Sequence, residues 1–275
     1  MSGEPFFKMC GSGNDFVFLD AREIAQADWP PDRMARVCAR GTGVGADGLV
    51  FLGPGAAPGA VRFAFFNSDG SRGEMCGNGA LCATRLSVLI GLVPGPDVSL
   101  ETDAGLVRGR VSPGQPARAE LLLPDVQGVR SLTVPPGAGE EAAGFAVVGV
   151  PHLVVPVRDL EGVDLPVRGR FLRSHPALGP AGANVNFVSR DGDTWAMRTY
   201  ERGVEAETLA CGTGAVACAT ILGLRGLARM PWSVRSRSGA VLRISGELDA
   251  AGGLREPRLS GQARVIYRGA FGPDV

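Results

Sequence analysis

Residues 74–85 read EMCGNGALCATR, and residues 209–220 read LACGTGAVACAT. In both stretches a cysteine stands in front of Gly-x-Gly-Ala and an apolar run follows. Arg85 is the one charged residue between Ala80 and Leu92, and residues 215–224 carry no charge. A helix that is apolar nearly all round must be buried, and these runs are too short to cross a membrane. We therefore expect two central helices, each wrapped by the strands of its own domain.

The rest of the chain consists mainly of short β runs that are separated by turn residues, which predicts an α+β fold. The order of hairpins, polar loop, cysteine turn and apolar helix occurs twice, with Cys211 135 positions after Cys76. This weak internal repeat predicts two similar domains, 1–118 and 119–261. The turn-rich stretch 111–118 is the expected boundary, and a closing strand within 262–275 could return to the first domain. Two further helices are expected at 32–40 and 166–174.

Composition excludes several classes of function. Basic and acidic residues number 28 each, so the net charge of zero argues against nucleic-acid binding and against a membrane-surface role. The first ten residues lack the features of a signal peptide. The sequence contains no uninterrupted run of about 18 apolar residues, so no membrane span is expected. We expect a cytosolic protein whose six cysteines stay reduced.

The two cysteine turns suggest a chemistry. The positive end of a helix dipole and the N–H groups of the first turn stabilise a thiolate, and glycines leave those N–H groups open to an anion. If two such turns face one carbon next to a carboxylate, one thiolate can remove its proton while the other thiol protonates the opposite face. Lys8, the single lysine, lies outside any pyridoxal-phosphate motif, so this inversion would need no cofactor.

Simpler interpretations remain for most of the cysteines. A cysteine without a partner motif is usually a small buried residue, which we expect for Cys10, Cys38, Cys82 and Cys218. Metal and redox sites are disfavoured because no Cys-x-x-Cys pair exists and the chain has two histidines. The glycine-rich stretch 41–48 lacks the lysine of a phosphate-binding loop and is expected to be a turn.

Several motifs together resemble the diaminopimelate epimerase family. They occur in the order found in that family and are GSGNDFV (11–17), NSDGSRGEMCGNG (67–79), PH (151–152), NVNFV (184–188), YERG (200–203) and ETLACGTGA (207–215). The related proline racemases are similar around the first cysteine only. The resemblance implies two domains, each a rolled, mostly antiparallel sheet around a central buried helix, with the active site in the cleft between them.

The resemblance also implies an activity, the cofactor-independent conversion of LL-diaminopimelate to the meso form in lysine and peptidoglycan-precursor synthesis. No metal is implied, and a homodimer is possible. By similarity, Cys76 and Cys211 are the acid and base thiols. The other implied roles are carboxylate binding by Gly77, Asn78, Gly212 and Thr213, substrate contacts by Asn14, Asn67, Asn184, Glu201 and Arg202, and tuning of a cysteine pKa by His152 and Glu201.

Three positions depart from the family pattern. Val150 stands where an asparagine is common, Gly48 replaces a common glutamine, and the segment ERGVEAET (201–208) is one residue longer than usual. Two alternatives therefore stay open. The protein could be a related racemase or epimerase with another amino-acid substrate, or a non-catalytic thiol protein that binds anions.

Overall fold

The computed structural model describes residues 3–115, 117–249 and 252–274. The chain divides into two compact units, Met1–Leu121 with Ser260–Val275 and Leu122–Leu259. The expected boundary stretch, 111–118, contains residue 116, which lies outside the described residues. No helix in the described ranges is long and apolar enough to span a membrane.

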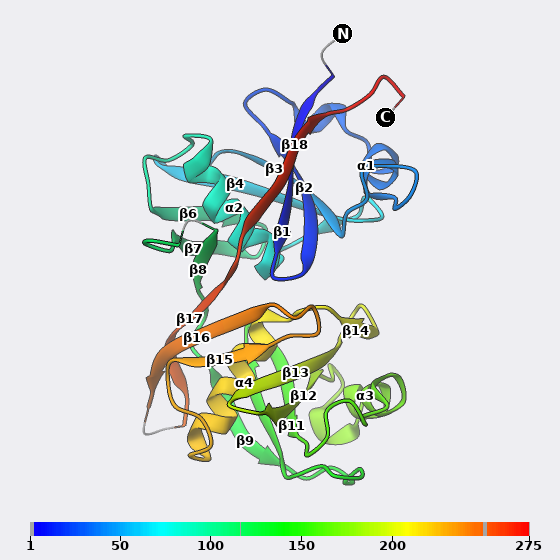
Figure 1. Cartoon of the computed structure of the whole chain (residues 1–275), viewed down its shortest axis with the longest axis vertical. Coiled ribbons are helices and arrows are strands. Elements are labelled where there is room, and N and C mark those ends of the chain that lie inside the picture. The colour runs from blue at the N-terminus through cyan, green and yellow to red at the C-terminus, as the bar shows by residue number, and fades with distance from the viewer. Residues whose placement is uncertain (1–2, 116, 250–251, 275) are drawn as a thin grey trace. The chain divides into compact units, whose positions relative to one another are not determined.

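Unit 1 is built around one mixed sheet (Figure 1). Its elements are β1 (Pro5–Gly11), β2 (Asn14–Asp20), the 3-10 helix η1 (Gln26–Asp28), α1 (Pro31–Cys38), β3 (Gly48–Pro54), β4 (Ala60–Asn67), β5 (Arg72–Gly73), α2 (Gly77–Leu89), β6 (Asp97–Thr102), β7 (Gly105–Val111), β8 (Arg118–Leu122) and β18 (Arg264–Ala270). The strands pair in the order β18-β1-β2-β3-β4-β6-β7, and β5 pairs with the end of β4. The pairs β2–β3 and β4–β6 are parallel, and the other pairs in this order are antiparallel.

Unit 2 repeats this architecture. Its elements are β9 (Gln127–Leu132), β10 (Ala143–Val148), β11 (Val150–Pro156), α3 (Leu165–Arg173), the 3-10 helix η2 (Pro176–Leu178), β12 (Asn184–Asp191), β13 (Thr194–Glu201), β14 (Ala206–Thr208), α4 (Gly212–Leu224), β15 (Trp232–Arg235), β16 (Val241–Leu248) and β17 (Leu254–Gln262). The strands pair in the order β9-β10-β11-β12-β13-β15-β16, and β14 pairs with the end of β13. The pairs β11–β12 and β13–β15 are parallel, and the other pairs in this order are antiparallel. Parallel and antiparallel pairs therefore follow one another across the sheet in the same order in both units. The expectation of two similar α+β domains is confirmed.

The central strands of unit 1 are apolar on both faces because a helix covers each face. On β3, Leu49 and Phe51 pack in one cluster with Met34 and Val37 of α1. Helix α2 contacts β1, β2, β3, β4, β6 and β7, so the sheet curves around it. A strand buried on both sides reads as a continuous apolar run, which explains segments such as LVFL at 49–52.

The two central helices approach their sheets closely. Helix α4 contacts β10, β11, β12 and β16, as α2 contacts the strands of unit 1. Gly109 on β7 faces Thr84 of α2, and Gly144 on β10 faces Ile221 of α4. A side chain at either glycine would occupy the space of the helix residue. The Thr84 and Thr220 hydroxyls donate to carbonyls four residues earlier, so these buried polar groups are satisfied within their helices.

The sequence missed some elements and displaced others. Strand β17 was missed because REPR interrupts its apolar pattern, although Leu254, Pro257 and Leu259 all point inward. Strand β9 was missed because its residues are mostly exposed and polar. Both central helices begin directly after the cysteine, at Gly77 and Gly212, so the Gly-x-Gly segments form the first helical turns.

The close packing of α2 can be tested at Gly109. We expect Gly109→Val to lower the free energy of unfolding by about 1–3 kcal/mol, because the added atoms would overpack the contact with Thr84. Urea unfolding measures the change. Gly272→Val is the matched control, since a Cβ there would meet nothing within 4 Å, and it should change the stability by less than about 0.5 kcal/mol. Equal effects of the two variants would contradict the packing described for α2.

Candidate active site

Cys76 and Cys211 occupy the same structural position in the two units. Each is the N-cap residue of its central helix and has an extended backbone, with φ and ψ of −133° and 119° for Cys76 and −127° and 108° for Cys211. Their carbonyls accept the first helical hydrogen bonds, from the backbone N–H groups of Ala80 and Ala215. Neither side chain caps its helix. Each thiol therefore stands at the positive end of a helix dipole.

The first helical turns behind the two thiols differ in their surroundings. A Cβ placed on Gly77 would meet no atom within 4 Å, so this turn is open. A Cβ on Gly212 would collide with the Leu259 side chain. Thr213 lies beside its thiol, with its Oγ1 3.6 Å from the Sγ of Cys211. Both glycine-rich first turns are thus present, and the turn in unit 1 has more free space at its first residue.

In unit 1 the structure brings together two of the expected substrate contacts. The Asn78 amide donates to the side-chain oxygen of Asn14 over 2.7 Å, and the Asn14 amide donates to Asp47 over 2.9 Å. Asp47 also accepts a 2.7 Å hydrogen bond from Arg40. This chain of contacts fixes which end of the Asn14 amide faces Asn78. Sequence reasoning missed Asp47, which lies at the end of the glycine-rich stretch that was interpreted as a turn.

Asn67 lies apart from that chain of contacts. It ends β4, is exposed, and donates to the Ser71 hydroxyl over 3.0 Å. Its cross-strand partner is Gly48, one of the three departures from the family pattern. A Cβ at Gly48 would lie 2.6 Å from the ring of Phe65 and 2.7 Å from the Phe66 carbonyl. The Phe65 ring therefore fills the space that a longer side chain at position 48 would need.

In unit 2 the structure joins Asn184 to Arg202. The side-chain oxygen of Asn184 accepts from the backbone N–H of Arg202 over 2.8 Å, and its amide donates to the Pro151 carbonyl over 3.4 Å. Within the described part of the chain, neither Glu201 nor Arg202 takes part in an ion pair.

The longer segment 201–208 does not displace Glu201 from its strand. Glu201 pairs with Ala206 across the hairpin, and the extra residue is taken up in the turn between them. Glu205 adopts a left-handed φ of 55° there, and its backbone N–H donates to the Glu201 carbonyl over 2.8 Å. Burial raises the pKa of the Glu201 carboxyl above its usual value.

His152 is fully buried on β11. Burial and the nearby positive charge of Arg202 lower the pKa of this histidine to about 3. The imidazole is therefore neutral at physiological pH and carries no positive charge with which to stabilise a thiolate. Any effect of His152 on a cysteine pKa must come through a hydrogen bond.

The remaining cysteines have the surroundings of structural residues. Burial raises the pKa of Cys38 to about 11, and it raises the pKa of Cys82 and of Cys218 well above the usual thiol value. Cys10 is half-buried on β1. Across the described ranges, no group of three or more His, Cys, Asp or Glu side chains is arranged to hold a metal ion.

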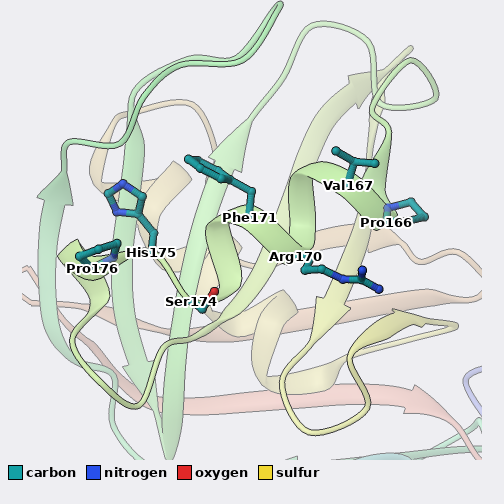
Figure 2. Close-up of a pocket in the computed structure, with 7 residues that line it drawn as sticks. All are labelled: Pro166, Val167, Arg170, Phe171, Ser174, His175 and Pro176. Carbon is teal, nitrogen blue, oxygen red and sulfur yellow. The ribbon is translucent and has the colours of Figure 1, made fainter.

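A shallow hollow lies elsewhere on unit 2, along α3 and η2 (Figure 2). Its volume is about 580 Å³, and Val167, Phe171 and His175 are among its lining residues. None of the expected site residues lines it. We therefore place the candidate active site at the two cysteine turns.

Comparison with known proteins identifies the family. The model of the family described as diaminopimelate epimerase matches residues 6–116 and 144–247. The chain is 43% identical over 272 residues to the diaminopimelate epimerase of Gemmatimonas aurantiaca, covering 96% of this chain and 98% of that protein. It is also 43% identical over 282 residues to that of Aquifex aeolicus, covering 98% of each. The chain belongs to the diaminopimelate epimerase family.

Solved structures share the fold of this family member. A predicted epimerase from Pseudomonas aeruginosa superposes with a TM-score of 0.67 at 19% identity, covering 98% of this chain and 99% of that chain. A phenazine biosynthesis protein of the PhzF family from Bacillus anthracis gives a TM-score of 0.72 at 12% identity, covering 99% and 100%. At these identities the likeness shows the two-domain fold alone.

Thiol labelling of the folded protein should distinguish Cys76 from the buried cysteines by their rates of reaction. With its pKa raised to about 11 from 9.0, Cys38 should carry about a hundredfold less thiolate near neutral pH than an ordinary thiol. We expect iodoacetamide at pH 8 to label Cys76 well before Cys38, Cys82 and Cys218, as measured by peptide mass spectrometry. In urea all six cysteines should react alike. Labelling of Cys82 or Cys218 at the rate of Cys76 in the folded protein would contradict this assignment.

Stability should depend on the charge state of His152. Its folded pKa of about 3 lies below the unfolded value of about 6.5, so the unfolded chain binds the proton more tightly. This contribution to the free energy of unfolding is constant above pH 6.5 and falls as the pH drops from there toward 3. Between pH 6.5 and 4.5 the loss should be about 2–3 kcal/mol.

Urea unfolding at several pH values measures this loss, and His152→Gln is the control that removes the titrating group. The pH dependence of the variant should be weaker by the stated amount. An unchanged pH dependence would show that His152 is not buried in its neutral form.

Proposed function

We propose that this protein converts LL-diaminopimelate to meso-diaminopimelate without a cofactor, using Cys76 and Cys211 as the acid and base. The carrying observation is that both cysteines are the N-cap residues of the buried central helices, in two units with the same topology. Membership of the diaminopimelate epimerase family supports this substrate. A cytosolic location and a homodimer stay predictions from the sequence.

The proposed chemistry starts from the weak acidity of the α-proton. Its removal builds negative charge on the carboxylate, and fixed N–H donors at a helix N-terminus can stabilise that charge. Gly77 leaves such a turn open to a carboxylate. One thiolate takes the α-proton while the other thiol gives a proton to the opposite face, so the carbon inverts and protons balance. The mechanism requires both thiols to reach one α-carbon.

The polar residues that the family motifs assign to the substrate suit a molecule with charges at both ends. Arg202 offers a guanidinium fork for a carboxylate, and it has no ion-pair partner among the described residues. Glu201 offers an acceptor for an ammonium group. Asn78, held by Asn14, stands in the first turn of α2 next to Cys76. We propose that these side chains, with Asn67 and Asn184, select the substrate.

Two departures from the family pattern favour one alternative, a related epimerase with another amino-acid substrate. Phe65 fills the space next to Gly48, and Val150 offers no amide. These changes remove two polar contacts that a distal carboxylate or ammonium group could use. A panel of amino acids tests this alternative, which would be favoured by turnover of a cyclic or monocarboxylic amino acid and none of diaminopimelate.

Single substitutions test the proposed roles of the two thiols. We expect Cys76→Ala and Cys211→Ala each to lower kcat for epimerisation of LL-diaminopimelate at least about a thousandfold, because each removes one of two proton-transfer groups. The conversion is followed by separating the LL and meso isomers. Cys10→Ala is the control and should keep nearly full activity.

Two results would contradict the proposal. Either cysteine variant could keep near wild-type activity, which would exclude a two-thiol mechanism. The unaltered protein could also bind anions and react at its thiols without turning over any amino acid, which would favour the non-catalytic thiol protein.

A further inference from the structure

Asn186 is a fully buried polar residue that the sequence motifs did not assign to the site. It lies on β12, two positions after Asn184, and therefore on the same face of the sheet. Its side-chain oxygen accepts from the Thr199 hydroxyl over 3.0 Å. Its amide nitrogen donates to the Leu153 carbonyl over 3.2 Å and lies 3.1 Å from Nδ1 of His152. All parts of this amide are thus engaged.

These contacts determine where the proton of His152 lies. A backbone carbonyl can only accept, so the end of the Asn186 amide that faces Leu153 must be the NH₂ group. The same NH₂ group faces Nδ1 of His152, which must then accept. A proton on Nδ1 would point at the amide protons. The neutral imidazole is therefore the tautomer with its proton on Nε2.

The other side of Asn186 lies against the turn of Cys211. A Cβ on Gly214 would collide with the Asn186 side-chain oxygen and would lie 3.2 Å from the Sγ of Cys211. Asn186 and the thiol thus flank the same glycine in the first turn of α4. The amide that sets the tautomer of His152 thus packs against the same helical turn as a proposed catalytic thiol.

His152 Nε2 is buried and forms no hydrogen bond within the part of the chain that the structure describes. Folded proteins seldom leave a buried N–H without an acceptor, because the hydrogen bond that it made to water in the unfolded chain is then lost and not replaced. A donor of this kind is suited to an acceptor that carries negative charge during the reaction, and Asn186 links this imidazole to the Cys211 turn.

We propose that Asn186 is a positioning residue, which holds His152 as the neutral Nε2–H tautomer and so provides a hydrogen-bond donor to an anionic acceptor at the Cys211 turn. The acceptor is the Cys211 thiolate or the substrate carboxylate, which share this chemistry. The role of this donor in the reaction, which is the catalytic half of the inference, rests on the proposed function. The assignment of the tautomer rests on the contacts of Asn186 alone.

Nitrogen NMR of the protein labelled with ¹⁵N-histidine tests the tautomer directly. The chain has two histidines, His152 and His175, and a His175→Gln variant assigns their signals. We expect long-range ¹H–¹⁵N spectra to show Nε2 of His152 protonated and Nδ1 not. A proton on Nδ1 in the wild-type protein would overturn the inference, whatever the activity.

The Asn186→Asp variant tests whether the tautomer matters to the reaction. A carboxylate of the same shape accepts where the amide donated, so the proton of His152 should move to Nδ1. We expect kcat to fall about 10- to 100-fold, more than any change in KM, as for other groups that orient a reacting side chain. Thr199→Ser is the matched control, because it keeps the hydroxyl that donates to Asn186. We expect this variant to keep the wild-type tautomer of His152 and the wild-type activity.

The outcomes separate this inference from the proposed function. A tautomer that changes in Asn186→Asp with no loss of kcat would overturn the positioning role while leaving the two-thiol mechanism intact. Wild-type protein with the Nε2–H tautomer and no epimerisation would overturn the proposed function and the catalytic half of the inference. In Cys211→Ala, a shifted Nε2 signal before substrate is added identifies the thiolate as the acceptor. A shift only after diaminopimelate is added identifies the carboxylate.

Discussion

The burial of one nearly uncharged helix inside each rolled sheet is the constraint on which the rest of the structure depends. A helix surrounded by strands must be apolar on all sides. Its few hydroxyl groups must donate hydrogen bonds to carbonyls of the same helix, and the strands that pass closest to it must carry small residues. Thr84 and Gly109 show all of this in unit 1. Such a helix exposes functional groups only at its ends. The N-terminal end carries the cysteine, the glycines and the positive end of the dipole, so packing and proposed chemistry meet at one residue in each unit.

The two units repeat a topology but surround their thiols differently. In unit 1 the turn behind Cys76 is open at Gly77, and a chain of amides leads from Asn78 to Asn14. In unit 2 Gly212 is covered by Leu259, and the turn of Cys211 is supported by buried Asn186. In the proposed mechanism two thiols act on opposite faces of one α-carbon. The repeated fold supplies both thiols, and each is surrounded by different supporting residues.

Much of the fold could be predicted because burial leaves apolar runs in the sequence, as in β3 and both central helices. Strand β17 could not, because its charged residues face outward and Pro257 interrupts the pattern. The cysteines stand out because they recur at one position of a repeated pattern. Asp47 and Asn186 could not be found in this way, since each acts through a hydrogen bond to a residue far along the chain. His152 was expected to tune a thiol, but only the structure shows that burial keeps it neutral.

The labelling pattern of the first turnovers in heavy water tests the two-thiol mechanism most directly. With one group on each face of the α-carbon, the proton removed from LL-diaminopimelate is not the one returned. Mass spectrometry at low conversion should find deuterium at the inverted carbon of every meso product, while the recovered LL substrate carries none. Product that retains the original hydrogen would indicate a single group acting on both faces. That result would contradict the roles assigned to Cys76 and Cys211.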